Sequence, residues 1–103
     1  SANFETGFAR VDVTGLQMRS GSGRAWIEGT AVDAEQAGGT YFVVLTVWDG
    51  GRMTGLSVTP VEWEDGTAFR TQPAAYEKGQ SLEYAVWDSL HLPKVIAMGT
   101  LSK

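Results

Sequence analysis

Cysteine is absent from the 103 residues, and lysine occurs only as Lys78, Lys94 and Lys103. Without cysteine there is no disulfide and no thiolate metal site. A net charge of −4 with few lysines argues against nucleic acid and against an anionic membrane as partners, because clustered positive charge holds both. No apolar run approaches the roughly 18 residues that a membrane-spanning helix needs.

Residues arranged for catalysis are also lacking. The single histidine, His91, follows Asp88 and Ser89, but neighbours in one loop do not assemble a catalytic triad. The acidic cluster over 62–65 ends in an Asp-Gly turn and is predicted to be a solvated loop rather than a glycosidase carboxylate pair. No phosphate-binding glycine loop or metal-ligand spacing occurs. We therefore expect no enzyme, no cofactor and no metal, with a calcium site at Asp33 and Glu35 left open.

The most apolar stretch of the chain is 41–61. Tyr41 to Trp48 is rich in aromatic and β-branched residues, Asp49-Gly50-Gly51 follows, and a second apolar run reaches Val61. This pattern predicts a hairpin at the centre of the core. Its first strand is apolar on both faces, so we expect the opposing sheet to cover one face and loops or a partner to cover the other. Pro60 predicts an edge position, a bulge or a change of sheet.

Further short strands are predicted by alternation over 8–13, 24–32, 67–72, 81–87 and 94–101. The stretch 15–23 follows the first of these strands, and its end, Ser20-Gly21-Ser22-Gly23, is predicted to be a flexible connector. Seven strands and no convincing helix predict an all-β, antiparallel two-sheet β-sandwich of immunoglobulin or fibronectin type. A small barrel is the structural alternative. The length indicates one domain over 1–103, with residues 1–7 loosely held.

Two segments carry a resemblance. The hairpin 41–53 resembles the "apolar strand, aromatic, Asp, x, Gly, Arg, apolar" hairpin of small β-sandwich modules in secreted Firmicutes proteins, and 82–90 resembles their later segment ending in Trp-Asp-Ser-Leu. The modules continue with Met-Lys-like residues before a proline, whereas this chain has Leu92-Pro93-Lys94. The resemblance covers roughly residues 40–97. It implies a non-catalytic, extracellular accessory module, covalently linked to other modules of a bacterial multimodular chain and monomeric by itself.

Tryptophan is the feature that suggests a ligand. Trp26 shares a predicted strand face with Glu28, and Trp63 lies between two glutamates, so both are candidates for an exposed position beside a carboxylate. Such a tryptophan could equally cover the edge of the sandwich, with its N–H bonded to a backbone carbonyl. With Tyr41 or Tyr76 nearby, the two exposed tryptophans would form an aromatic strip on which sugar rings stack.

The other two tryptophans, Trp48 and Trp87, are predicted to lie in the core or at its rim. The leading functional hypothesis is therefore a carbohydrate-binding module for plant cell-wall polysaccharide. The alternative is a structural spacer, or a protein-interaction module, with no sugar site. A sugar module should expose an aromatic strip, whereas an interaction module should show a compact apolar patch.

Overall fold

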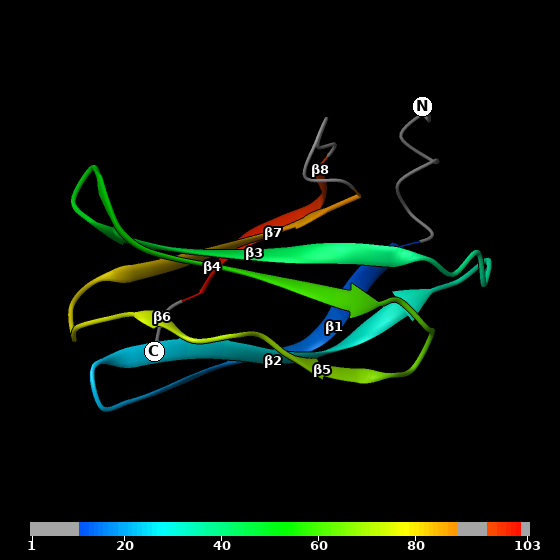
Figure 1. Ribbon diagram of the computed structural model, residues 1–103, viewed down its shortest axis with the longest axis horizontal. Helices are drawn as coiled ribbons and strands as arrows, with labels where there is room; N and C mark the ends of the chain where they lie inside the picture. The colour runs from blue at the N-terminus through cyan, green and yellow to red at the C-terminus, as the bar shows by residue number, and fades with distance from the viewer. Residues whose placement is uncertain (1–10, 89–94, 102–103) are drawn as a thin grey trace.

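The computed structural model describes residues 11–88 and 95–101, and these form two antiparallel sheets packed face to face (Figure 1). No helix occurs in these ranges, and hence none that could cross a membrane. The expectations for residues 1–7, for the strand start at 8–10 and for 89–94 lie outside the described residues.

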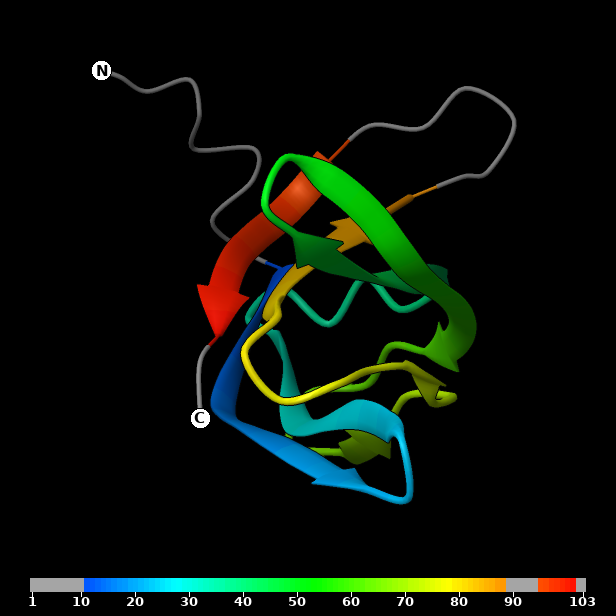
Figure 2. The ribbon, with the colours of Figure 1, turned by 90° about the vertical axis from the view of Figure 1, so that its left-hand side faces the viewer.

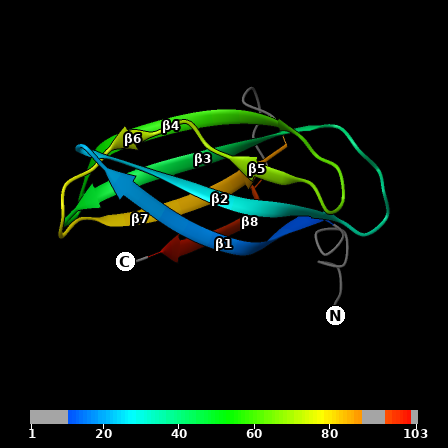
Figure 3. The ribbon, with the colours of Figure 1, turned by 90° about the horizontal axis from the view of Figure 1, so that it is seen from below.

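The first sheet is built on β2 (Arg24–Asp33), which pairs with β1 (Val11–Gly21) on one side. The short strands β5 (Ala68–Arg70) and β6 (Ala74–Ala75) pair with its other side (Figure 3). The predicted alternation of β2 is confirmed, because alternate residues from Ala25 to Ala31 are buried and those from Trp26 to Val32 are half-buried on the outer face.

The second sheet has the order β4-β3-β7-β8, with β3 (Thr40–Asp49) and β7 (Ser81–Trp87) in the middle. Its outer strands are β4 (Arg52–Glu62) and β8 (Val95–Leu101). The predicted hairpin is confirmed: β3 and β4 pair along their length across the Asp49-Gly50-Gly51-Arg52 turn. Pro60 lies on the edge strand β4, one of the positions predicted for it. An edge strand has no neighbour on one side, so it tolerates a residue without an N–H.

The strand order is that of an immunoglobulin-like sandwich. Strands β1, β2 and β5 take the places of strands A, B and E, and β4, β3, β7 and β8 those of C′, C, F and G. The all-β sandwich predicted from the pattern is therefore confirmed. Eight strands are described rather than seven, because the two-residue β6 is too short to leave a pattern in the sequence.

The predicted end of the first strand before Gly15 is wrong, because β1 continues to Gly21. Of the predicted connector 20–23, only Ser22 and Gly23 form a turn. The register of β1 against β2 shifts between Thr14 and Gln17, and Gly15 has a φ of 64°. This is a bulge of the kind in which glycine takes the left-handed conformation, so Gly15 bends the strand without ending it. Leu16 then turns inward, over Gly29 of β2.

The core lies between the inner faces of β2 and β3. Both long sides of the sandwich are also closed: β1 contacts β8 on one side, as Figure 2 shows. On the other side, the Ser57 hydroxyl donates to the Gln72 carbonyl, and the Gln72 N–H donates to the Thr59 hydroxyl, both at 2.8 Å. Gly55 fits here because a Cβ would collide with the Ala75 carbonyl oxygen. Side-chain hydroxyls therefore join β4 to the first sheet.

Candidate functional site

The outer face of the first sheet carries Trp26, half-buried as the alternation predicts. Its indole Nε1 donates to Glu28 Oε2 at 3.3 Å, and the Arg70 guanidinium carbon lies 4.8 Å from the centre of its ring. Arg19 donates to the other carboxylate oxygen of Glu28, also at 3.3 Å. Trp26 and Glu28 thus lie together, as predicted, but one face of the indole is already occupied by an arginine.

The pKa of Glu28 is lowered from its ordinary value, first by the hydrogen bond from Trp26 and then by that from Arg19. Both donors stabilise the ionised carboxylate. This polar cluster is internally satisfied: each charge has a neighbour of opposite sign within the same sheet face.

Trp63 is not exposed, and its predicted role as a platform is wrong. Its side chain is 2 % exposed, and the indole Nε1 donates to the Val32 carbonyl at 3.0 Å. The ring lies 5.6 Å from those of Tyr41 and of Phe69. Trp63 continues the alternation of β4, in phase with the buried Ser57 and Thr59, and this places it between the two sheets despite its glutamate neighbours.

The two predicted tyrosines do not extend a strip either. Tyr41 meets Trp63 edge-on and packs against the core, and Tyr76 is likewise partly buried against it. Because Trp63 is interior while Trp26 lies on an outer face, the predicted aromatic strip does not exist.

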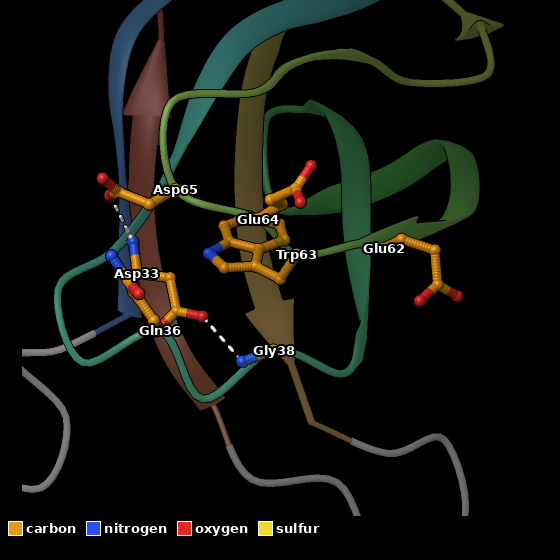
Figure 4. A pocket seen from close by; sticks show the side chains of 7 residues that line it. All are labelled: Asp33, Gln36, Gly38, Glu62, Trp63, Glu64 and Asp65. Atoms are coloured by element: carbon orange, nitrogen blue, oxygen red, sulfur yellow. Dashed lines mark hydrogen bonds between the residues drawn. The ribbon is translucent and has the colours of Figure 1, made fainter.

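A hollow of about 640 Å³ lies at one end of the sandwich, between the β2–β3 and β4–β5 connections (Figure 4). Figure 4 shows its carboxylates, those of Asp33, Glu62, Glu64 and Asp65, pointing in different directions. No three such groups in the described ranges are placed to hold a metal ion. The hollow is a gap between loops whose acids do not converge.

Asp33 holds these loops in shape. Its side chain is 1 % exposed, and its carboxylate accepts from the backbone N–H groups of Ala37 at 3.2 Å and Gly38 at 2.8 Å. Its own N–H donates to Asp65 Oδ1 at 2.8 Å. A buried carboxylate with these donors shapes the backbone, so Asp33 has a structural role.

The outer face of the second sheet differs from that of the first. We call it the apolar sheet face. Most of its side chains are aliphatic or aromatic, and they come from all four strands: Phe42, Val44 and Trp48 of β3; Met53, Leu56, Val58 and Pro60 of β4; Ala85 and Trp87 of β7; and Met98 of β8. Thr46, Ser81, Glu83 and Thr100 lie on the same face, and Glu83 is the one charged group in its described central part.

Several of these apolar groups are open to solvent. Met53 is 48 %, Leu56 53 % and Met98 70 % exposed. Trp87, predicted to lie in the core, lies on this outer face, paired with Phe42 and half-buried. Its buried Nε1 has no acceptor among the described residues. The matching face of the first sheet carries arginines, glutamate and threonines instead, as is usual for a solvated sheet.

The apolar sheet face is therefore the candidate functional site. Its described side chains are mostly apolar, and what such side chains contribute is burial against another apolar surface. The sequence indicated this site through the strand 41–48, which is apolar on both faces. Loops or a partner were expected to cover the face that does not contact the opposing sheet. Alternate residues of β4 and β7 complete the surface, and only the strand order reveals that they adjoin.

Comparison with known proteins identifies no relative: the chain matches no protein-family model and none of the curated proteins searched.

Proposed function

We propose that the protein is a non-catalytic binding module whose apolar sheet face binds the surface of a protein. The observation that carries the proposal is the contrast between the two outer faces of one sandwich, one polar and one with exposed Met53, Leu56 and Met98. A contiguous exposed apolar patch marks an interaction site. The flexible methionines adapt to a partner's contours.

The composition of the face supports a protein partner over a sugar. Sugar sites combine exposed aromatic rings with several polar groups that bind hydroxyls. On this face the most exposed groups are aliphatic, and the rings of Phe42, Trp48 and Trp87 are partly covered. The extracellular, multimodular bacterial setting is also part of the proposal, and it rests on the resemblance of 41–53 and 82–90 alone.

The absence of cysteine allows a direct test, because an introduced thiol is unique. A photo-crosslinker is attached to a Leu56→Cys variant and, as the matched control, to an Ala68→Cys variant on the exposed edge of the other sheet. We expect the probe at position 56, and not at 68, to crosslink a protein from an extract of the producing cell surface.

The crosslinked protein is then identified, purified and titrated against the native chain and against a Leu56→Asp variant. Loss of binding in Leu56→Asp, with an unchanged far-UV spectrum, supports the proposal. Equal crosslinking from both positions, or unchanged binding by Leu56→Asp, would overturn it.

Carbohydrate binding remains the second candidate, and the pairing of Trp26 with Glu28 on an outer face favours it. Its test is native electrophoresis through gels containing plant cell-wall polysaccharides. Retardation that disappears in Trp26→Ala would support a sugar site. Trp63→Ala is unsuitable as a test, because that residue lies in the core.

A further inference from the structure

We infer that the partner of the apolar sheet face is a second copy of this chain, packed sheet against sheet as a two-fold dimer. This rests on the proposed function, and it differs from the monomer expected from the sequence. Three features support a second copy: the area of the face, the placement of its exposed side chains and the position of its one central charge.

The area suffices for a specific pair. The four strands have 11 residues in β4, 10 in β3 and 7 each in β7 and β8; spaced about 4.8 Å apart with a rise of about 3.3 Å per residue, they give roughly 550 Å² of sheet per copy. Two copies would bury about 1,100 Å², which clears the ~1,000 Å² that a specific interface needs. Interfaces below about 1,200 Å² are typical of weak and transient complexes, so we expect a dissociation constant on the order of micromolar or weaker.

The exposed side chains suit a two-fold axis that runs parallel to the strands, between β3 and β7. Such an axis places β4 of one copy over β8 of the other, at both margins of the interface. Val58 of β4 and Met98 of β8 lie in the same row across the sheet, the row of Val44 and Ala85. Each Val58 would therefore face Met98 of the second copy, and the contact occurs twice, as a two-fold interface requires.

Glu83 favours the same axis. It lies on β7 in the row of Thr46 on β3. Because the axis places β7 over β3, each Glu83 faces Thr46 of the second copy rather than another carboxylate. With strands about 4.8 Å and sheets about 10 Å apart, the two Glu83 backbones would lie about 11 Å from each other. Two carboxylates at the same interface still repel each other, so Glu83 weakens the dimer.

The first experiment is sedimentation velocity of the purified chain over a concentration range from about 1 to about 500 μM, chosen to bracket the expected dissociation constant. We expect a monomer–dimer equilibrium. Leu56→Asp and Met98→Asp should each weaken it at least ~10-fold, because each would bury an unpaired charge. Glu83→Gln should strengthen it by removing the repulsion. Ala68→Asp, on the exposed edge of the other sheet, should leave it unchanged.

The second experiment tests the axis. Val58→Cys and Met98→Cys variants are mixed and treated with a short bismaleimide, which can only join the introduced thiols because the chain has none of its own. We expect covalent dimers in the mixture and few in either variant alone. Efficient crosslinking of Val58→Cys with itself would overturn this axis.

The outcomes separate this inference from the proposed function. A chain that stays monomeric throughout the range, while the probe at position 56 captures a different protein, would overturn the second copy and leave the proposed function standing. A dimer unaffected by Leu56→Asp and Met98→Asp would overturn this interface. Monomer throughout, with no selective crosslink at position 56, would overturn both.

Discussion

The carboxylate of Glu28 shows how a single half-buried residue depends on its neighbours. The indole N–H of Trp26 is the main cause of its lowered pKa. We predict that Trp26→Phe, which removes this donor, raises the pKa of Glu28 toward its ordinary value. Measurement is by NMR titration of the glutamate side chains, with Trp48→Phe on the other sheet as the control. An unchanged pKa in Trp26→Phe would assign the lowering to the arginines.

The direction of the pH effect on stability follows from this pKa. Because it is lower in the folded state, ionised Glu28 stabilises the fold at pH values above its unfolded pKa, and this stabilisation is lost as the pH falls through the folded pKa. As the pH is lowered, the free energy of unfolding of Trp26→Phe should therefore fall less steeply than that of the native chain.

At the scale of elements, the connection from β2 to β3 depends on Asp33. We predict that Asp33→Asn lowers the free energy of unfolding by about 1–3 kcal/mol, because asparagine offers one acceptor oxygen where two backbone N–H groups need acceptors. The measurement is urea unfolding. Asp49→Asn, at the exposed hairpin turn, is the control and should change stability by less than about 0.5 kcal/mol. Equal effects of the two substitutions would contradict the structural role of Asp33.

Elements with regular alternation could be predicted from the sequence, and irregular ones could not. The inner and outer faces of β2 follow from alternation alone, and so does the hairpin of β3 and β4. Gly15 was misleading because a glycine at a β-bulge and a glycine at the end of a strand give the same sequence pattern. Trp63 was misleading for another reason: it is in phase with the inner residues Ser57 and Thr59, which are polar, whereas the apolar residues of β4 lie on the outer face.

The candidate site was predictable in one strand only. The apolar stretch from Tyr41 to Trp48 predicts a strand that is covered on both faces. Leu56 and Met98 belong to two other strands, and only the strand order shows that these strands lie in the same sheet. Trp87 was assigned to the core because a large apolar residue is usually buried. Only the pairing of β7 with β3 shows that its face is the outer one.

At the scale of the whole molecule, Trp63 connects the two sheets. It follows β4 of the second sheet, and its indole is bonded to Val32 of the first. We predict that Trp63→Ala lowers the free energy of unfolding by about 3–5 kcal/mol, because it leaves a large cavity. Trp48→Ala, on the outer face, should cost less than half as much. Denaturant unfolding followed by far-UV circular dichroism measures both. A loss of similar size in the two variants would argue against this central role.

The hydroxyl contacts of Ser57 and Thr59 have a consequence for solubility. The segment from Tyr41 to Val47 has no charge, no proline and no glycine, which is the composition of sequences that form amyloid. It is harmless while β4 and β7 occupy both of its sides. Only β4 shields one of those sides, and it is fastened to Gln72 by two side-chain hydroxyls. The ladder with β3 also holds β4 in place. An opening of β4 would offer an unpaired edge to other chains, so these two hydroxyls add to the protein's resistance to aggregation.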